Sequence, residues 1–238
     1  MSKKRKVYIV RLIARCLVLI LCTAAAVVKP ELYNLLDGMN FFSRLSPLHL
    51  LWIVWMVDMV YQVIPLKRNE ARGSRKLFAT CFRPAGGGFQ TEYLQRYIKS
   101  ANKAALKVAA LWTALIAVIG LLFHMDLLNK IGLFLICVVF YVCDLICVLI
   151  WCPFRLIMKT RCCTTCRIFN WDHMMMFSPL IFLDGFYAVS LVVMAVLSLL
   201  VWEISIILHP ERFWENSNIA LKCSECTDNL CTQYCGKA

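Results

Sequence analysis

The sequence predicts an all-α integral membrane protein with about five transmembrane helices, and three observations lead to this prediction. Hydrophobic residues make up 61% and charged residues 17% of the 238 positions, whereas soluble domains are about 45–50% apolar and about 25% charged. The apolar residues gather in blocks long enough to cross about 30 Å of hydrocarbon at about 1.5 Å per residue. The longest polar interval covers only residues 66–105, so the chain has no room for a separate soluble domain.

Each apolar block is a predicted span, and the sequence marks some blocks more clearly than others. The five ranges are 7–28, 47–65, 106–123, 131–151 and 188–208. The first is the weakest, because Arg11 and Arg15 must extend to the interface or lie outside the hydrocarbon. Its basic start also fits a cleaved signal peptide, but we expect an uncleaved signal anchor. Residues 177–187 are apolar but contain Pro179 and Asp184, which predicts an interfacial or re-entrant piece.

The distribution of Lys and Arg predicts the orientation, because basic loops stay in the cytoplasm. Six basic residues lie at or before Arg15, nine lie in 66–105 and four lie in 152–176, whereas the other loops are close to neutral. A five-span chain in a plasma membrane would then have a cytoplasmic N-terminus. The membrane domain covers residues 1–208, and the cysteine-rich tail, residues 209–238, would lie outside.

The formal net charge of +12 has a cause in this topology and does not predict nucleic-acid binding. Residues 90–110 place apolar and basic side chains on two stripes at helical spacing. The apolar stripe consists of Leu94, Tyr97, Ile98, Ala101 and Ala105, and the basic stripe of Arg96, Lys99, Lys103 and Lys107. This pattern predicts an amphipathic helix that lies on the inner leaflet, contacts the anionic headgroups of the lipid bilayer and then turns into the third span.

Four cysteines in the tail could close one zinc shell, since structural zinc takes four thiolates in a tetrahedron. They are Cys223, Cys226, Cys231 and Cys235. Their spacing resembles a zinc knuckle, except that Cys231 stands where the knuckle has histidine, the last gap is one residue short and the usual glycine is missing. Two disulfides are the alternative if the tail faces an oxidising exterior, and free thiols are the third.

A second cysteine group lies after the fourth predicted span, on the side where thiols stay reduced. Cys163 and Cys166 have the spacing of a metal hairpin, and Cys162 or Cys152 is a candidate third ligand. The flanking arginines are expected to lower the pKa of these thiols. The run typical of cubane iron–sulfur clusters is missing, no βαβ pattern supports a thioredoxin-type motif, and lipidation is an alternative. His173 is either a further ligand or, as we favour, part of an anchor at the membrane interface.

The two groups could also form one site, in which Cys163, Cys166, Cys223 and Cys226 supply two Cys-x-x-Cys hairpins to one zinc. A single crossing by residues 188–208 forbids this site, because it puts the groups on opposite sides. Residues 177–208 would have to enter the membrane and return as a bent hairpin. These 32 residues are short for two full helices, so we expect the five-span topology.

Asp58 and Asp144 lie near the middle of the second and fourth predicted spans. A carboxylate in hydrocarbon is destabilising by at least a few kcal/mol, so each should face the bundle interior with a partner or be protonated. Such residues either handle protons and cations or join helices through hydrogen bonds. We favour the second interpretation.

These motifs identify no family, and whether the protein is an enzyme stays open. The leading hypothesis is an accessory, sensor or assembly subunit whose cysteine groups hold zinc and which acts with a membrane protein partner or as a homo-oligomer. The second hypothesis is a membrane thiol–disulfide or iron–sulfur redox protein. The third is a small proton- or ion-coupled transporter that uses Asp58 and Asp144.

Overall fold

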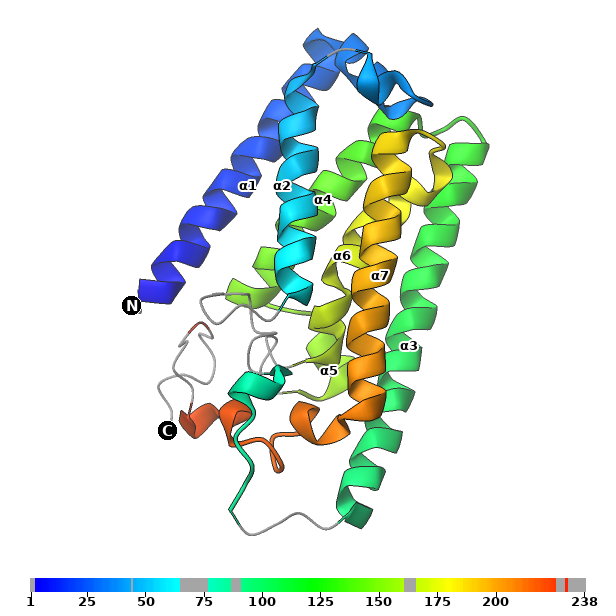
Figure 1. Ribbon diagram of the computed structural model, residues 1–238. Coiled ribbons are helices and arrows are strands. Elements are labelled where there is room, and N and C mark those ends of the chain that lie inside the picture. The colour runs from blue at the N-terminus through cyan, green and yellow to red at the C-terminus, as the bar shows by residue number, and fades with distance from the viewer. Residues whose placement is uncertain are drawn as a thin grey trace.

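The computed structural model describes residues 3–43, 45–64, 77–86, 91–160, 166–225 and 230, and within them every regular element is helical. The long helices are α1 (Lys3–Val28), α2 (Pro47–Val63), α3 (Thr91–His124), α4 (Lys130–Leu149) and α7 (Phe186–Leu208). They run side by side along one bundle (Figure 1). Four of them, α1, α3, α4 and α7, are long and apolar enough to cross a membrane, whereas α2 has 17 residues. The all-helical architecture is therefore confirmed for the described residues, four apolar helices are consistent with a multi-pass membrane protein, and a fifth span stays a prediction.

Shorter helical pieces connect the long helices. They are η1 (Pro30–Leu36), η2 (Asn40–Phe42), η4 (Ala79–Cys81), α5 (Phe154–Met158), η6 (Arg167–Trp171), α6 (Asp172–Phe177), η7 (Ser178–Phe182), η8 (Pro210–Phe213), η9 (Ile219–Leu221) and η10 (Cys223–Glu225), where η marks a 3₁₀ helix. Local signals set where helices begin. The Ser46 hydroxyl accepts the Leu48 N–H at 3.3 Å and the His49 ring accepts the Ser46 N–H at 3.0 Å, which makes a capping box for α2. Asn129 caps α4 by accepting the Gly132 N–H at 2.8 Å.

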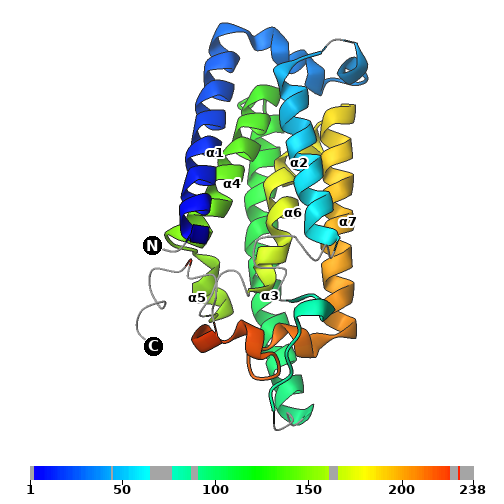
Figure 2. The same ribbon diagram turned by 60° about the vertical axis from the view of Figure 1, so that its left-hand side comes forward.

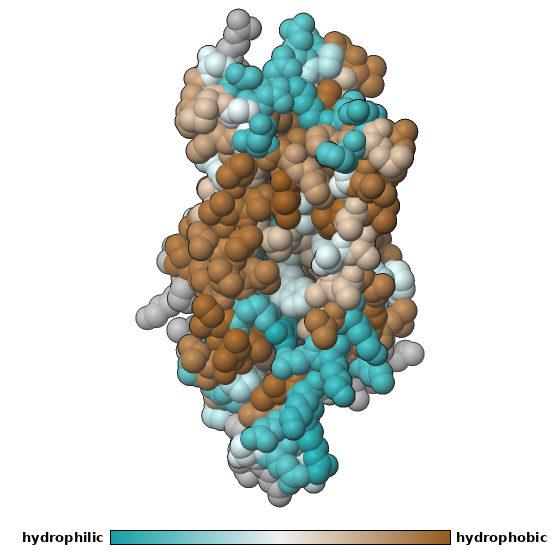
Figure 3. All heavy atoms as spheres, turned by 90° about the vertical axis from the view of Figure 1, so that its right-hand side faces the viewer, coloured by the Kyte–Doolittle hydropathy of each residue, from teal (hydrophilic) through white to brown (hydrophobic). Residues whose placement is uncertain are grey.

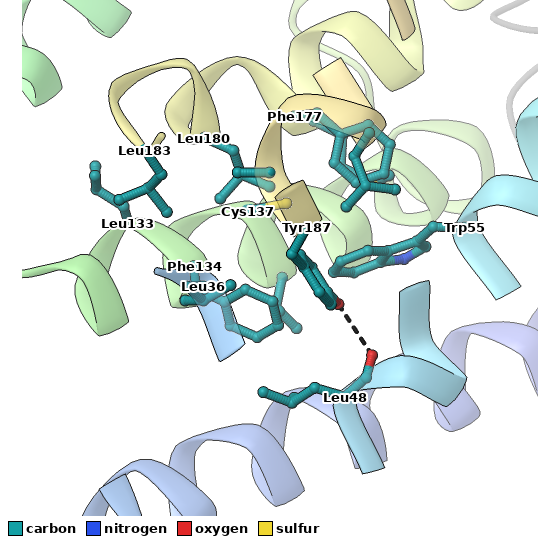
Figure 4. Packing of buried hydrophobic residues seen from close by; sticks show 14 of the residues in the cluster. Leu36, Leu48, Trp55, Leu133, Phe134, Cys137, Phe177, Leu180, Leu183 and Tyr187 are labelled. Atoms are coloured by element: carbon teal, nitrogen blue, oxygen red, sulfur yellow. Dashed lines mark hydrogen bonds between the residues drawn. The ribbon is translucent and has the colours of Figure 1, made fainter. Parts of the chain in front are cut away.

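The main core joins α2, α4, α6 and α7 through large aromatic side chains. Trp55, Phe134, Phe177 and Tyr187 are fully buried, and the Trp55 ring meets Phe177 edge to face at 5.2 Å. Such a pair adds about 0.5–1.5 kcal/mol beyond the area it buries. The Tyr187 hydroxyl donates to the Leu48 carbonyl at 3.1 Å (Figure 4). Burial leaves this hydroxyl no water, so the hydrogen bond ties the start of α7 to the start of α2.

The segment from η6 to η7 crosses most of the bundle, and this is the largest departure from the predicted topology. It runs from the end at which α3 begins and α4 and α7 end, which we call the basic end, up between α4 and α7 (Figures 1 and 2). Its rise is about 29 Å, because 3₁₀ residues rise about 2.0 Å and α residues about 1.5 Å. The predicted interfacial or re-entrant piece is thus the upper part of an ascending segment. α7 then runs back to the basic end.

The tail accordingly lies at the basic end and not at the opposite one. Pro84 and Asn218 form an antiparallel bridge, and the Ile219 N–H donates to the Arg83 carbonyl at 2.9 Å. Residues 83–85 precede α3, within the interval predicted to be cytoplasmic. Because the two segments touch, they lie on the same side, and the prediction of a tail on the other side from this interval is wrong. The error came from starting the ascent at residue 177, whereas it begins at Arg167 and so includes ten further residues.

α3 corrects a second prediction, because it is one continuous helix of 34 residues and does not turn from a surface helix into a span. The apolar stripe at its start is covered by the tail. Leu94 is buried, the Tyr97 ring stacks on Trp214 at 5.6 Å and the Tyr97 hydroxyl donates to the Phe213 carbonyl at 3.1 Å. Figure 3 shows the face over α3 and α7, where hydrophobic residues gather in the middle and hydrophilic residues at the two ends.

Candidate functional site

Halfway along α1, Arg15 forms a buried ion pair with Asp144 of α4. Its Nη1 lies 2.8 Å from the Asp144 Oδ2, it also donates to the Tyr141 carbonyl, and its guanidinium carbon lies 3.7 Å from the centre of the Tyr141 ring. Arg15 is 3% exposed. Asp144 therefore faces the bundle interior with a partner, as expected. Asp144 and the Tyr141 ring stabilise the Arg15 charge inside the bundle, and the prediction that Arg15 extends to the membrane interface or lies outside the hydrocarbon stays a prediction.

A second buried group centres on His173 of α6. Its Nδ1 lies 2.9 Å from the Asp172 Oδ1, and its Nε2 lies 3.6 Å from the Asp58 Oδ2. Gln62 donates to the same Asp172 oxygen at 2.9 Å, and Ser198 donates to the Gln62 oxygen at 3.4 Å. Only the imidazolium carries a proton on both ring nitrogens, so two facing carboxylates favour the charged form. His173 is buried, so the interpretation of this residue as an interfacial anchor is wrong.

A third group joins η6 to α7. Arg167 donates through Nε to the Glu203 Oε1 at 3.1 Å, and the Trp171 indole donates to the same oxygen at 2.7 Å. Arg167 also donates to Asn102 of α3. Glu203 lies toward the basic end and is paired with Arg167 and Trp171. Its position follows from the direction of α7, which descends toward that end.

We call these three groups together the polar layer. Asp58, Asp144 and Glu203 each lie five residues before the end of their helix, or about 7.5 Å at the α-helical rise. The Glu203 group lies nearest to the basic end, because Ser198, which meets Gln62, stands five residues before Glu203 on α7. All five long helices and α6 contribute a member to the layer. The sequence alone did not predict that Asp172 and His173 belong to the polar layer. The signal that could have indicated this was two adjacent ionisable residues directly before an apolar run.

A cavity of about 260 Å³ adjoins this layer between α3, α4, α5 and α6. Asp144 and Asp172 border it on the side of the polar layer, and the rest of the wall is mostly apolar. That wall includes Trp112, Phe140, Phe154, Met175, Met176 and the cysteines at 143, 147, 152 and 166. The cavity therefore brings two carboxylates from different groups to the edge of one apolar space.

The predicted metal ligands are only partly within the residues that the structure describes. Cys162, Cys163, Cys226, Cys231 and Cys235 lie outside them, as does the side chain of Cys223. Within the described ranges no group of three or more candidate ligands comes together, so the zinc prediction stays a prediction.

Cys152 and Cys166 are the candidate ligands of the central group whose side chains the structure describes, and both line the cavity beside the polar layer. Cys166 is buried, and burial raises the pKa of its thiol to about 11. The expected lowering of this pKa by the flanking arginines is therefore wrong for Cys166. Arg167 donates instead to Glu203 and Asn102.

One buried cluster nevertheless connects the two cysteine segments. Cys166 of the central group and Leu230, which lies between Cys226 and Cys231 of the tail, both belong to it, together with Phe169. Each of the three is at most 8% exposed. The joined four-cysteine site requires that both segments lie at one end of the bundle. The positions of Cys166 and Leu230 meet this requirement.

Comparison with protein-family models, with curated proteins and with solved structures found no match to this chain. No relative therefore supplies a substrate, a partner or a set of site residues. A functional argument has to start from the geometry of the polar layer and of the two cysteine segments.

Proposed function

We propose that this protein moves protons, alone or coupled to a small solute, through the polar layer around His173. The observation that supports this proposal is the position of His173 between Asp172 and Asp58, at 2.9 and 3.6 Å. Histidine is the side chain whose ordinary pKa lies closest to neutral pH. The imidazolium can release its Nδ1 proton to Asp172 and take up another proton at Nε2 from Asp58, so that one carboxyl loses a proton and the other gains one.

The segment that holds His173 also fits a transport role. α6 has six residues and lies between the 3₁₀ helices η6 and η7, so the helix that carries His173 and Asp172 is discontinuous. Interrupted helices near the middle of a bundle commonly form the substrate and coupling-ion sites of transporters. Their irregular backbone is stable only where protein or a cavity surrounds it, and α4 and α7 pack against this segment.

The two aspartates named by the transport hypothesis would have different roles. Asp144 is engaged by the Arg15 guanidinium at 2.8 Å, and this pair joins α1 to α4. The Asp58 side chain is 33% exposed, whereas that of His173 is 6% exposed. Asp58 is thus the more accessible member and would exchange protons with the surroundings of the bundle, while Asp172 is the buried carboxylate on the other side of His173.

Proton flux in reconstituted vesicles tests this proposal. Vesicles that contain the protein and a trapped pH-sensitive dye should acidify when a pH gradient is imposed, and His173→Gln should reduce the rate to that of empty vesicles. His124→Gln is the matched control, because His124 is an exposed residue at the opposite end. Wild-type flux in a folded His173→Gln variant, or no flux in the wild type under a gradient and under a membrane potential, would reject a proton pathway here.

A second function, structural metal binding, is favoured by the shared burial of Cys166 and Leu230. With the described part of the tail at the basic end, the basic residues that the structure describes in 83–107 and 155–167 lie toward one end, and the positive-inside rule would place that end and the N-terminus in the cytoplasm of a plasma membrane. Thiols there stay reduced, which favours zinc over disulfides. Cys163 and Cys166 would supply two ligands and the tail cysteines two more, so that one zinc clamps the tail of an accessory, sensor or assembly subunit.

Metal analysis of detergent-purified protein tests this second function. We expect about one zinc per chain, from the four-ligand stoichiometry of structural zinc, and its loss in Cys163→Ser. Cys16→Ser is the control, because Cys16 lies within α1. Visible absorption from an iron–sulfur cluster would favour the redox alternative, and a folded protein without metal would reject the clamp. Reporter fusions after Gly73 and after Ala238 should both report the cytoplasm.

A further inference from the structure

A groove of about 590 Å³ lies at the basic end, separate from the cavity beside the polar layer. Its walls come from the first half of α3, from the residues at the end of α5 and from the tail segment 210–221. The tail thus builds one wall against a helix more than 100 positions earlier in the chain. This wall is held in place, since Tyr97 stacks on Trp214 and donates to the Phe213 carbonyl.

The rim of the groove is basic. Lys103 and Lys107 stand one turn apart on α3, and Lys159 faces them from the end of α5. Glu215 lies on the same rim and reduces the positive charge of the three lysines without cancelling it. Arg167 lies deeper and is engaged by Glu203. An anion at the rim would therefore meet three ammonium groups that can turn toward it.

Lys159 stands at a backbone position that does not favour lysine. It caps α5 in the left-handed conformation, with φ of 53°. Glycine or asparagine adopts this conformation at a helix end with less strain. The backbone conformation therefore does not explain a lysine at this position. The ammonium group that Lys159 places at the groove does explain it.

The floor of the groove is apolar and continues into the lipid-facing surface. Ile206, Phe213 and Leu221 are buried beneath it. Just beyond the rim, Leu106 of α3 and Ile207 of α7 are 71% and 75% exposed, on two helices that are long and apolar enough to cross a membrane. A ligand that fits this surface carries an anionic head and an apolar tail.

We propose that this groove binds one anionic phospholipid, with its phosphate headgroup between Lys103, Lys107 and Lys159 and its acyl chains on α3 and α7. This is a defined site and differs from the diffuse attraction of a basic surface for acidic lipids. A soluble phosphate compound shares the headgroup chemistry but leaves the apolar surface beside the rim uncovered. The lipid is therefore the better match.

Native mass spectrometry of the detergent-solubilised full chain tests this proposal. The protein should retain one phosphatidylglycerol in preference to phosphatidylcholine. Lys103→Gln, Lys107→Gln and Lys159→Gln should each weaken retention about fivefold, from the attraction of about one lysine for an anionic lipid surface. Lys99→Gln is the matched control, since Lys99 lies one turn earlier on α3 and does not line the groove.

Three outcomes would overturn the proposal. Equal retention of phosphatidylcholine would show that the groove does not distinguish an anionic headgroup from a zwitterionic one. An equal loss in Lys99→Gln would show diffuse attraction without a defined site. Displacement of the lipid by glycerol 3-phosphate at equal concentration would show that the ligand is a soluble phosphate compound, because the acyl chains would then contribute nothing.

Discussion

Arg15→Met and Asp144→Leu, alone and combined, measure how much the buried pair between α1 and α4 contributes to folding. Each single variant removes one charge and leaves its partner at an almost fully buried position, since the two side chains are 4% and 12% exposed. The double variant removes both charges and replaces them with apolar side chains that suit the surrounding core. The comparison therefore separates the pair from the packing around it.

The structure gives the size of the expected effect. Two unit charges at 2.8 Å attract each other by about 6 kcal/mol at an effective dielectric constant of about 20, and the Tyr141 ring adds about 2 kcal/mol for a desolvated guanidinium. Desolvation of the two ions opposes this by several kcal/mol each, so the net contribution of the intact pair is small. Removal of one partner is different, because an uncompensated buried charge is destabilising by about 3–5 kcal/mol.

Unfolding in mixed detergent micelles, followed by tryptophan fluorescence, measures these free energies. We expect each single variant to lose about 3–5 kcal/mol and the double variant to lose less than the sum by at least about 2 kcal/mol. Arg96→Met is the control, since Arg96 pairs with Glu92 at an exposed position and should change stability by about 0.5 kcal/mol or less. Additive losses in the double variant would mean that the two charges do not interact, and would refute the ion pair.

Three further predictions concern single positions. Gly185→Ala should be strongly destabilising or prevent folding, because a Cβ there would lie 1.9 Å from the Leu36 carbonyl oxygen; expression and thermal stability in detergent measure it. Tyr187→Phe should lower the free energy of unfolding by about 1–3 kcal/mol, since the buried Leu48 carbonyl loses its donor. An unchanged free energy of unfolding in the same assay would contradict this hydrogen bond. Cys166 should react slowly with iodoacetamide at pH 8 in the folded protein, as read by peptide mass spectrometry, and rapid labelling would contradict its burial. Because burial raises its pKa from 9.0 to about 11, the unfolded chain releases this proton first, and Cys166 should lower stability as pH rises from about 9 to 11.

Local features of the sequence were sufficient to predict the helices of this protein. Apolar blocks of sufficient length mark the long helices, and Ser46 marks the start of α2, because hydrophobicity, capping and helix propensity act over a few neighbouring residues. The inward position of Asp144 was also predictable, since an isolated carboxylate in hydrocarbon is strongly destabilising at any site along a span.

The partners and the path of the chain were decided only by tertiary structure. Arg15 and Asp144 lie 129 positions apart, and which charge meets which depends on how α1 and α4 rotate and pack, which no local pattern encodes. The side of the tail depended on an ascent that begins at Arg167, ten residues before the predicted piece, and that forms because η6, α6 and η7 pack against α4 and α7. The same return of α7 brings Leu230 and Cys166 into one buried cluster and the tail against α3, because contacts between distant segments form only once the long helices have packed.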